Sequence, residues 1–214
     1  MSDAAARMDR MYRRQRRIYD LSRKYYLLGR DETIRRLRPA PDDRVLEIAC
    51  GTGRNLVHAA RLYPQARFFG LDVSEEMLDT ARTAIARAGL ASQIAVAKAD
   101  ATDFDPARLF GQARFERVMI SYALSMIPPW REALARSLDV VAPGGSLHCV
   151  DFGDCAGLPG AFRTGLRAWL AAFGVTPRDD LGEALAALAA PRGFACETRG
   201  WGLGYATLAV ARQG

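Results

Sequence analysis

The stretch Val45-Leu-Glu-Ile-Ala-Cys-Gly-Thr-Gly-Arg-Asn55 decides how this chain folds. It starts as a short apolar run, passes through two glycines and continues with a helical pattern, so it predicts a buried strand, a tight turn and a helix. Gly51 and Gly53 have no Cβ, which lets the main chain of the turn approach a ligand closely. In open α/β sheets, ligands bind beyond the carboxyl ends of the strands, near the point where the strand order reverses. We therefore expect a ligand crevice at this turn.

Strands and helices alternate along the rest of the chain. We predict strands at 45–49, 67–71, 93–98, 117–120 and 146–151, and helices at 55–63, 74–88, 106–110 and 130–138, with Ser74 as an N-cap and Pro143-Gly-Gly as a turn before the fifth strand. Such alternation is typical of parallel βαβ units. A loop at 153–160 and helices at 162–173 and 181–190 precede strands at 194–201 and 205–212, which indicate a hairpin. The predicted fold is α/β: a Rossmann-like, doubly wound sheet of seven mostly parallel strands with an antiparallel C-terminal edge.

The first 38 residues are strongly basic. They hold twelve Arg and Lys against five Asp and Glu, a net charge of +7, whereas the whole chain of 214 residues has +6. Residues 3–28 contain no Gly or Pro and predict a helix, and Asp31 predicts the N-cap of a short helix at 32–38 that Pro39 ends. We expect residues 1–41 to form a basic amphipathic helical lid or membrane-contact segment, and residues 42–214 to form the α/β domain.

Three interpretations of this basic segment stay open. It fits a solvated cap helix, an arm for nucleic acid, or an amphipathic helix on an anionic membrane. The charge is not spread over a recognisable nucleic-acid-binding fold, so no nucleic-acid partner is expected.

Composition excludes several other classes of protein. The four cysteines are scattered without a Cys-x-x-Cys pair and only two histidines are present, so no metal site is expected. The N-terminus lacks the apolar core of a secretory signal, and no stretch approaches the roughly 20 apolar residues that cross a bilayer. We predict a cytoplasmic protein. The sequence gives no indication of its oligomeric state.

Three positions, Glu47, Leu56 and Asp72, indicate which kind of ligand binds in this crevice. Glu47 lies inside a buried strand, where a carboxylate needs amide or cationic partners. The dinucleotide pattern requires a third glycine at position 56, where Leu56 stands, so a pyrophosphate site is not indicated. Asp72 ends the second strand 19 residues after Gly53, which is where a carboxylate meets a ribose diol.

These motifs together resemble the class I S-adenosylmethionine-dependent methyltransferase family. The segments that support the resemblance lie in the family's order across residues 42–151: Glu47–Gly53, Gly70–Leu78, Lys98–Asp103, Arg117–Ser125 and Val141–Leu147. The resemblance implies S-adenosylmethionine as cofactor and S-adenosylhomocysteine as product.

The resemblance also implies roles for individual residues. The glycine turn would line the methionine portion of the cofactor, Asp72 would hold the ribose hydroxyls, and Asp100 would accept from the adenine amino group. For Asp72 and Asp100 the alternative is an ordinary loop-capping carboxylate. The candidate cofactor residues are Tyr25, Arg30, Glu47, Cys50, Gly51, Thr52, Gly53, Asn55, Asp72, Val73, Met77, Asp100, Ala101 and Ser121.

A narrower resemblance concerns the methyl acceptor. The segment 19–31 is similar to the start of bacterial betaine-lipid N-methyltransferases, and the likeness continues through 52–55, 122–128 and 150–154. It implies successive methylation of the amine of diacylglyceryl-homoserine, at the inner face of the membrane. The alternatives are a phosphatidylethanolamine-type phospholipid, a soluble small molecule, or a non-catalytic methyltransferase-like binding subunit.

Methyl transfer to a neutral amine needs alignment and exclusion of water more than acid–base catalysis. The candidate catalytic residues are Tyr19, Tyr25, Ser121 and Tyr122, and Tyr205 is a further aromatic candidate. We expect His58 and His148 to be structural. Residues 153–180 are expected to help form the acceptor pocket. There Phe152, Phe162, Trp169 and Phe173 either line an apolar acyl channel or belong to the core.

Overall fold

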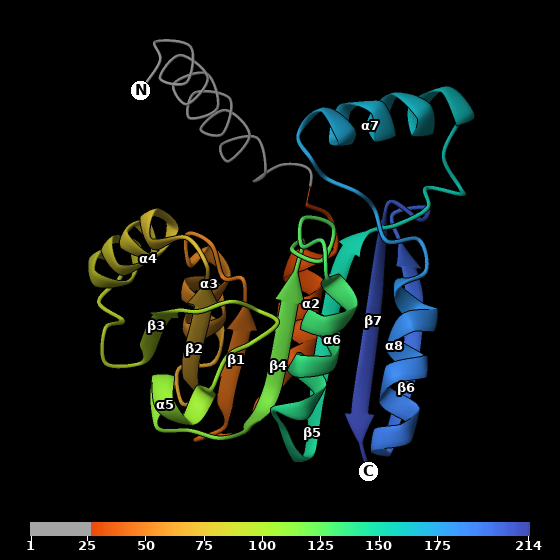
Figure 1. The fold of residues 1–214 in the computed structure, drawn as a ribbon. Coiled ribbons are helices and arrows are strands. Elements are labelled where there is room, and N and C mark those ends of the chain that lie inside the picture. The colour runs from red at the N-terminus through yellow and green to blue at the C-terminus, as the bar shows by residue number, and fades with distance from the viewer. Residues whose placement is uncertain (1–26) are drawn as a thin grey trace.

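The structure, a computed structural model, describes residues 27–214. Its centre is one seven-stranded sheet with the order β3-β2-β1-β4-β5-β7-β6 (Figure 1). The first five strands pair in parallel, and β7 is antiparallel to both β5 and β6. The predicted fold is therefore confirmed. The strands are β1 (Arg44–Ile48), β2 (Arg67–Asp72), β3 (Ile94–Lys98), β4 (Phe115–Ser121), β5 (Val141–Phe152), β6 (Phe194–Trp201) and β7 (Ala206–Gln213).

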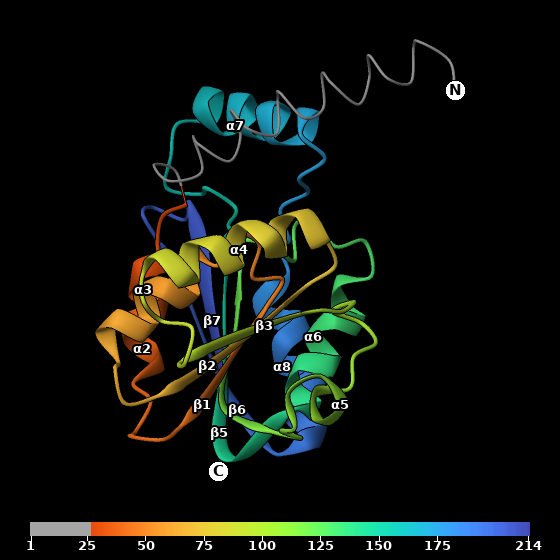
Figure 2. The same cartoon turned by 90° about the vertical axis from the view of Figure 1, so that its left-hand side faces the viewer.

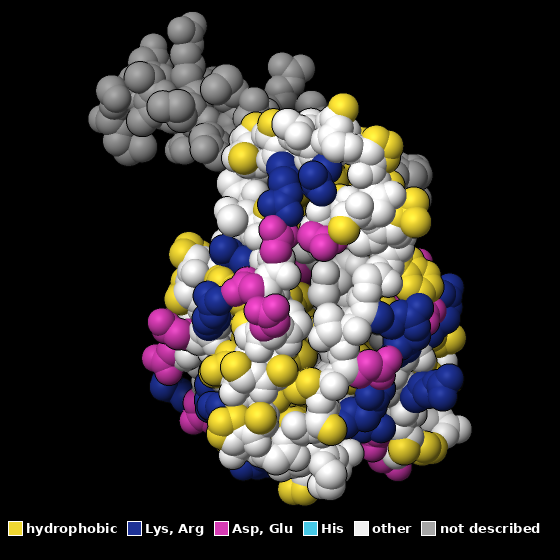
Figure 3. Space-filling model, turned by 90° about the vertical axis from the view of Figure 1, so that its right-hand side faces the viewer, with side chains coloured by type: hydrophobic (Ala, Val, Ile, Leu, Met, Phe, Trp, Pro, Cys, Tyr) yellow, Lys and Arg dark blue, Asp and Glu magenta, His cyan; other side chains and the backbone are white. Residues whose placement is uncertain are grey.

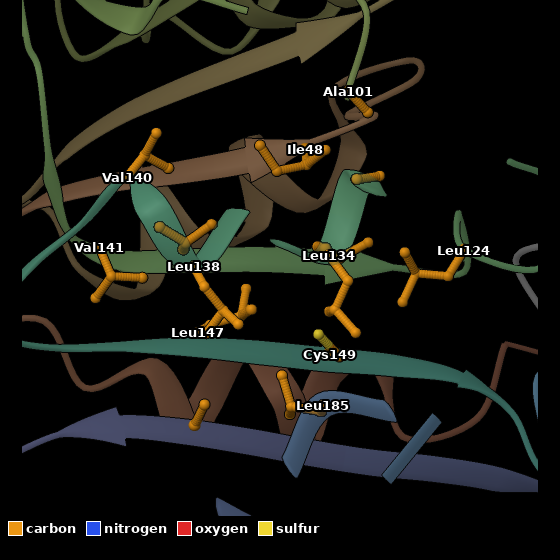
Figure 4. Packing of buried hydrophobic residues seen from close by; sticks show 14 of the residues in the cluster. Ile48, Ala101, Leu124, Leu134, Leu138, Val140, Val141, Leu147, Cys149 and Leu185 are labelled. Atoms are coloured by element: carbon orange, nitrogen blue, oxygen red, sulfur yellow. The ribbon is translucent and has the colours of Figure 1, made fainter. Parts of the chain in front are cut away.

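Helices cover both faces of this sheet. They are α2 (Arg30–Leu37), α3 (Arg54–Leu62), α4 (Glu75–Arg87), α5 (Pro106–Phe110), α6 (Trp130–Asp139), α7 (Gly160–Ala172), α8 (Leu181–Ala189) and a 3₁₀ turn at Ala190–Arg192. Figure 2 shows α2, α3 and α4 on one face and α5, α6 and α8 on the other. Two apolar clusters fill the two interfaces. Leu134 and Leu138 of α6 point toward Leu147 and Cys149 of β5 (Figure 4).

The strand order reverses between β1 and β4. From β1 the chain winds outward to β2 and β3, and from β4 it winds the other way to β5. The carboxyl ends of β1, β2 and β4 therefore lie side by side at one edge of the sheet, which we call the carboxyl edge. A crevice for a ligand is expected at such a switch point.

Two local predictions were wrong. Helix α2 begins at Arg30, and its N-cap is Gly29 with φ 80°, so Asp31 lies in the first turn instead of capping it. Pro143-Gly-Gly lies inside β5 as a bulge and does not precede the strand, because Phe115 pairs with Val141 while Arg117 pairs with Ser146. Gly145 permits this close approach, since a Cβ there would lie 2.7 Å from the Glu116 carbonyl oxygen.

Helix α7 covers neither face of the sheet. Figures 1 and 2 show it beyond the carboxyl edge. Of its thirteen residues only Leu170 is buried. Helix α2, the first of the described helices, differs in this respect, because Ile34 and Leu37 are buried in the same cluster as residues of α3 and α4. Residues 30–37 are thus packed into the body of the domain.

Candidate functional site

The glycine turn after β1 is built on left-handed main-chain conformations. Gly51 and Gly53 have φ 54° and 70°, and Gly53 is the N-cap of α3. The Gly53 N–H donates to the Cys50 carbonyl oxygen at 3.0 Å, which closes the turn. A Cβ on Gly51 would meet no atom within 4 Å, so this side of the turn faces open space. The turn can therefore present main-chain groups to a ligand.

Asp72 connects this turn to the end of β2. One carboxylate oxygen accepts from the Gly51 N–H at 2.8 Å, and the other accepts from the Ser74 N–H at 2.9 Å. The predicted N-cap Ser74 is confirmed, because its hydroxyl accepts from the Met77 N–H at 3.3 Å. Asp72 thus has the loop-capping contacts that the sequence left open. The predicted contact with a ribose would use the remaining lone pairs of the same oxygens.

Glu47 is the most unusual residue of the site. It is almost fully buried in β1, and one of its oxygens accepts from the Asn55 side-chain amide at 2.7 Å. Its second oxygen has no hydrogen-bond partner among the described residues. Burial raises the pKa of the Glu47 carboxyl to about 8, against the lowering effect of Asn55. A buried carboxyl with one unpaired oxygen is suited to accept a hydrogen bond from a cationic ligand group.

Cys50 and Thr52 complete the turn. Cys50 is buried, its N–H donates to the Leu71 carbonyl oxygen at 2.9 Å, and its side chain packs in the core with Leu56. Burial raises the pKa of the Cys50 thiol, so it stays protonated. Cys50 therefore supports the turn from behind, and Thr52 is half-buried beside it.

The predicted adenine residues follow β2 and β3. Val73 is 66% exposed directly after the buried Asp72, although it is a large apolar side chain. Met77 is half-buried in the first turns of α4, and Ala101 is buried. One oxygen of Asp100 accepts from the N–H and the hydroxyl of Thr102, which lower the pKa of the Asp100 carboxyl. Because β2 and β3 are neighbours, these residues come together at the carboxyl edge.

Ser121 and Tyr122 end β4 on the other side of β1. The Ser121 hydroxyl is buried and has no hydrogen-bond partner among residues 27–214. Tyr122 is fully buried with φ 52°, and its hydroxyl donates to the main-chain carbonyl of Leu28. Burial raises the pKa of Tyr122 well above its usual value. Ser121 is thus available to a ligand. The Tyr122 hydroxyl instead connects β4 to the segment before α2.

Of the remaining candidates, Arg30 lies within the described residues, whereas two tyrosines do not. Arg30 is buried at the start of α2, 3.8 Å from the Asp31 carboxylate, and its Nε makes no hydrogen bond with the described chain. Tyr19 and Tyr25 lie outside the described residues, as does the helix predicted at 3–28. His148 is buried, hydrogen-bonded to the Ser146 hydroxyl, and burial lowers its pKa to about 3.

Sequence reasoning missed Gly70. A Cβ at this position would lie 2.6 Å from Leu56 Cδ1 and 2.8 Å from Cys50 Sγ, so only glycine lets β2 pack against the glycine turn. The available signal was a glycine inside an otherwise apolar strand, which marks a close approach of another segment.

Comparison with known proteins agrees with this geometry. Residues 45–145 match the family described as a methyltransferase domain. This match spans strands β1 to β4 and the first residues of β5. The demethylmenaquinone methyltransferase of Listeria monocytogenes is 29% identical over 132 residues, which are 61% of this chain and 54% of that protein. The chain thus spans about half the length of this relative.

Two solved structures share the fold. An O-methyltransferase family protein from Burkholderia thailandensis has a TM-score of 0.64 at 21% identity, covering 96% of this chain and 58% of that one. Phosphoethanolamine N-methyltransferase 2 of Haemonchus contortus, in complex with S-adenosyl-L-methionine, has a TM-score of 0.67 at 15% identity, covering 86% and 52%. These structures share the expected fold, and the family match at 45–145 together with the relative from Listeria supports the expected class, an S-adenosylmethionine-dependent methyltransferase.

The residues of the site fit S-adenosylmethionine. The unpaired oxygen of Glu47 is placed for a cationic group, the open side of Gly51 leaves room for the methionine portion, and the exposed Val73 offers an apolar surface for adenine. Glu47 lies in β1, Gly51 follows β1 and Val73 follows β2, and these two strands are adjacent. The carboxyl edge therefore offers groups for each part of the cofactor.

Proposed function

We propose that this chain transfers methyl groups from S-adenosylmethionine to the head-group amine of a lipid, most specifically in successive steps from diacylglyceryl-homoserine to its trimethyl form. The observation that supports S-adenosylmethionine as the cofactor is the buried Glu47 carboxyl beside the open glycine turn. The proposed lipid acceptor rests on a sequence likeness to betaine-lipid N-methyltransferases. The likeness lies in segments 19–31, 52–55, 122–128 and 150–154.

The described residues suit an amine acceptor in one respect. An amine needs no base while it attacks if it arrives neutral, and its proton can leave to water. Tyr122 and His148 are unsuited to act as a base, because the Tyr122 hydroxyl donates to the Leu28 carbonyl and His148 is buried, which lowers its pKa to about 3.

The work of the protein is then binding and alignment. Glu47 and the turn at Gly51 would hold the methionine portion, Asp72 the ribose, and Val73 with Asp100 the adenine. When bound, the cofactor supplies a methyl group on a sulfonium sulfur, and transfer breaks the S–C bond, forms an N–C bond and leaves S-adenosylhomocysteine. Ser121 stands at the end of β4, where its unpaired hydroxyl can orient the incoming amine.

The basic N-terminal segment belongs to the same proposal. Within residues 1–41, the part that precedes α2 would act as lid and as contact with an anionic membrane, with Tyr19, Tyr25 and Arg30 near the cofactor, whereas residues 30–37 are packed into the domain. No helix within residues 27–214 has the length and apolar character to span a bilayer. Replacing Arg13, Arg14, Arg16 and Arg17 together with Gln should weaken binding to anionic vesicles, most strongly at low salt. Unchanged binding would remove the membrane role from this segment.

The deciding experiment incubates the full chain with methyl-labelled S-adenosylmethionine and lipid extracts. We expect label in a lipid that gains one to three methyl groups by mass spectrometry. Label in phosphatidylethanolamine derivatives would assign the phospholipid alternative, and label only in a soluble amine would refute the lipid proposal. Calorimetry with S-adenosylhomocysteine tests the non-catalytic alternative, since a binding subunit without a cofactor site would release no heat.

A further inference from the structure

Exposed large apolar side chains are unevenly distributed over this molecule. Within residues 27–214, seven of them are between 38% and 67% exposed: Leu28, Leu62, Val73, Met126, Phe162, Trp169 and Leu203. Leu62 ends α3 at the opposite edge of the sheet. The other six lie at the carboxyl edge, because they precede α2, follow β2, β4 or β5, or stand in the turn between β6 and β7. Single exposed apolar residues are ordinary, but their concentration at one edge indicates a contact surface.

Helix α7 holds two of these residues and is tied to the domain at both ends. Before the helix, the N–H groups of Cys155 and Gly157 donate to the carbonyl oxygens of Gly204 and Leu203 at 2.8 and 3.0 Å. After it, the Thr176 N–H donates to the Ser125 carbonyl oxygen at 2.8 Å. The position of α7 beyond the carboxyl edge is therefore fixed by hydrogen bonds at its ends, while most of its surface stays exposed.

The side chains of α7 divide into two groups. Phe162, Leu166, Trp169 and Phe173 follow at helical spacing, and the Trp169 and Phe173 rings meet edge-on at 5.1 Å. Leu166 and Phe173 pack on the cluster below, whereas Phe162 and Trp169 are 50% and 38% exposed. The charged residues of α7 are Arg163 and Arg167, and the helix has no acidic residue. Figure 3 shows yellow and dark blue side chains together on the upper part of the molecule, over α7.

We propose that α7 and the turn at 202–205 lie against an anionic lipid surface, with Phe162, Trp169 and Leu203 inserted among the head groups. An amphipathic helix with aromatic and basic residues and no acidic ones is the type that binds in a membrane interface. The inference rests on the proposed function, since a lipid acceptor must be presented at the edge where the cofactor site opens. The membrane contact that we assign to α7 and the turn at 202–205 is separate from any contact made by residues 1–26.

Charge complementarity favours a lipid surface over a protein. Arg167 pairs with Asp179 at 2.7 Å, which leaves Arg163 as the cation of this helix. Leu28 lies against Gly202, so the Arg-rich first 26 residues join the domain beside the same turn. On the far side of the edge, α4 begins with Glu75, which pairs with Arg82 at 2.6 Å, and Glu76, which an anionic surface repels. The contact is therefore confined to the α7 side, and the opening of the cofactor crevice stays accessible to a head group.

The test measures binding of the full chain to vesicles of phosphatidylglycerol and phosphatidylcholine by co-sedimentation, without cofactor or acceptor. The double variant Phe162→Ser/Trp169→Ser should lower the partition constant about tenfold or more, because two aromatic side chains no longer enter the interface. Leu62→Ser is the matched control: it removes a comparably exposed apolar side chain from the opposite edge and should bind like the wild type. Calorimetry with S-adenosylhomocysteine shows whether each variant keeps its fold and its cofactor site.

Other outcomes would overturn the inference. Equal vesicle binding by the double variant and the Leu62→Ser control would refute it. Loss of a dimer in the double variant by analytical ultracentrifugation, with vesicle binding unchanged, would assign the surface to a second copy of the chain. Faster trypsin cleavage at the arginines of residues 7–17, with vesicle binding unchanged, would assign it to the chain's own N-terminal segment. If vesicle binding follows the prediction but no lipid is methylated, the proposed acceptor is refuted. The proposed contact surface on α7 is then still supported.

Discussion

The hydroxyl of Tyr122 donates a hydrogen bond to the main-chain carbonyl of Leu28, 94 residues earlier in the chain. Tyr122 adopts φ 52°, a conformation that a bulky residue holds only when its surroundings fix it. Its ring packs edge-on against Phe152 at 4.8 Å, and its N–H donates to the Val150 carbonyl oxygen at 2.8 Å. Tyr122 thus joins the carboxyl end of β4 to the segment that enters α2, next to the Ser121 hydroxyl.

Tyr122→Phe should destabilise the fold and raise the KM for the acceptor. The variant keeps the ring and removes the donor of the partly buried hydrogen bond to the Leu28 carbonyl, at a cost of about 0.5–1.5 kcal/mol in urea unfolding. Tyr63→Phe is the control, because the Tyr63 hydroxyl donates at 2.8 Å to the Arg35 carbonyl in the last turn of α2, away from the site. Both variants should lose stability, and only Tyr122→Phe should change the KM. Equal kinetics in the two variants would show that the Tyr122 bond is purely structural.

Gly70→Ala should destabilise the domain by roughly 1–3 kcal/mol, the usual cost of overpacking. The added Cβ would lie 2.6 Å from Leu56 Cδ1 and 2.8 Å from Cys50 Sγ, so the glycine turn must shift. Gly165→Ala is the control, since a Cβ there meets no atom within 4 Å and alanine favours the helix. Thermal unfolding and calorimetry with S-adenosylhomocysteine measure both effects. Normal cofactor affinity in Gly70→Ala would contradict the inferred coupling between β2 and the turn.

The sheet could be predicted from the sequence because local patterns determine it. Apolar runs, the glycine turn and the Ser74 cap placed six of the seven strands to within two residues, and the predicted fifth strand starts five residues after β5 does. The errors came from contacts distant in sequence. Asp31 has the chemistry of an N-cap, but Gly29 takes that position through its left-handed conformation. Pro143-Gly-Gly has the chemistry of a turn, but pairing with β4 keeps it inside a strand.

In the candidate site, too, the sequence identified residues but not the contacts that they make in the fold. The sequence identified Glu47 as a buried carboxylate in need of partners, and Asp72 as either a ribose ligand or a loop-capping carboxylate. It did not identify their partners, because Asn55 and Gly51 become partners only when the turn has its observed shape. Tyr122 was a candidate catalytic residue, and the sequence did not indicate that its hydroxyl donates to the Leu28 carbonyl. Phe152 was a candidate for an acyl channel, and the structure buries it in the core with Tyr122 and Tyr205.

Asp72→Asn should lower stability even without cofactor. Asp72 accepts from the N–H groups of Gly51 and Ser74 through different oxygens, and an amide offers only one acceptor oxygen, so one donor loses its partner. We expect a loss of about 1–3 kcal/mol. Asp100→Asn is the comparison, because Asp100 is exposed and bonds only within its own turn to Thr102. It should weaken S-adenosylhomocysteine binding while stability stays near that of the wild type. If instead Asp100→Asn lowered stability and Asp72→Asn did not, Asp100 would be the carboxylate that stabilises the cofactor-free fold.

Glu47→Gln should stabilise the cofactor-free protein at pH 8 while weakening its cofactor binding. The Glu47 carboxyl has a pKa of about 8 in the fold and 4.5 as its ordinary value, so between these values only the unfolded chain loses the proton. The stability that this group contributes is thus present below pH 4.5 and falls as the pH rises toward 8, by about 1.4 kcal/mol per pH unit at most. Glutamine does not titrate, so the variant should show a flatter dependence of urea unfolding on pH. The same change removes the anionic acceptor for a cationic ligand group, and affinity for S-adenosylhomocysteine should fall about tenfold to a hundredfold. An unchanged pH dependence would show that Glu47 is already ionised in the cofactor-free fold, and an unchanged affinity would show that Glu47 does not contribute to cofactor binding.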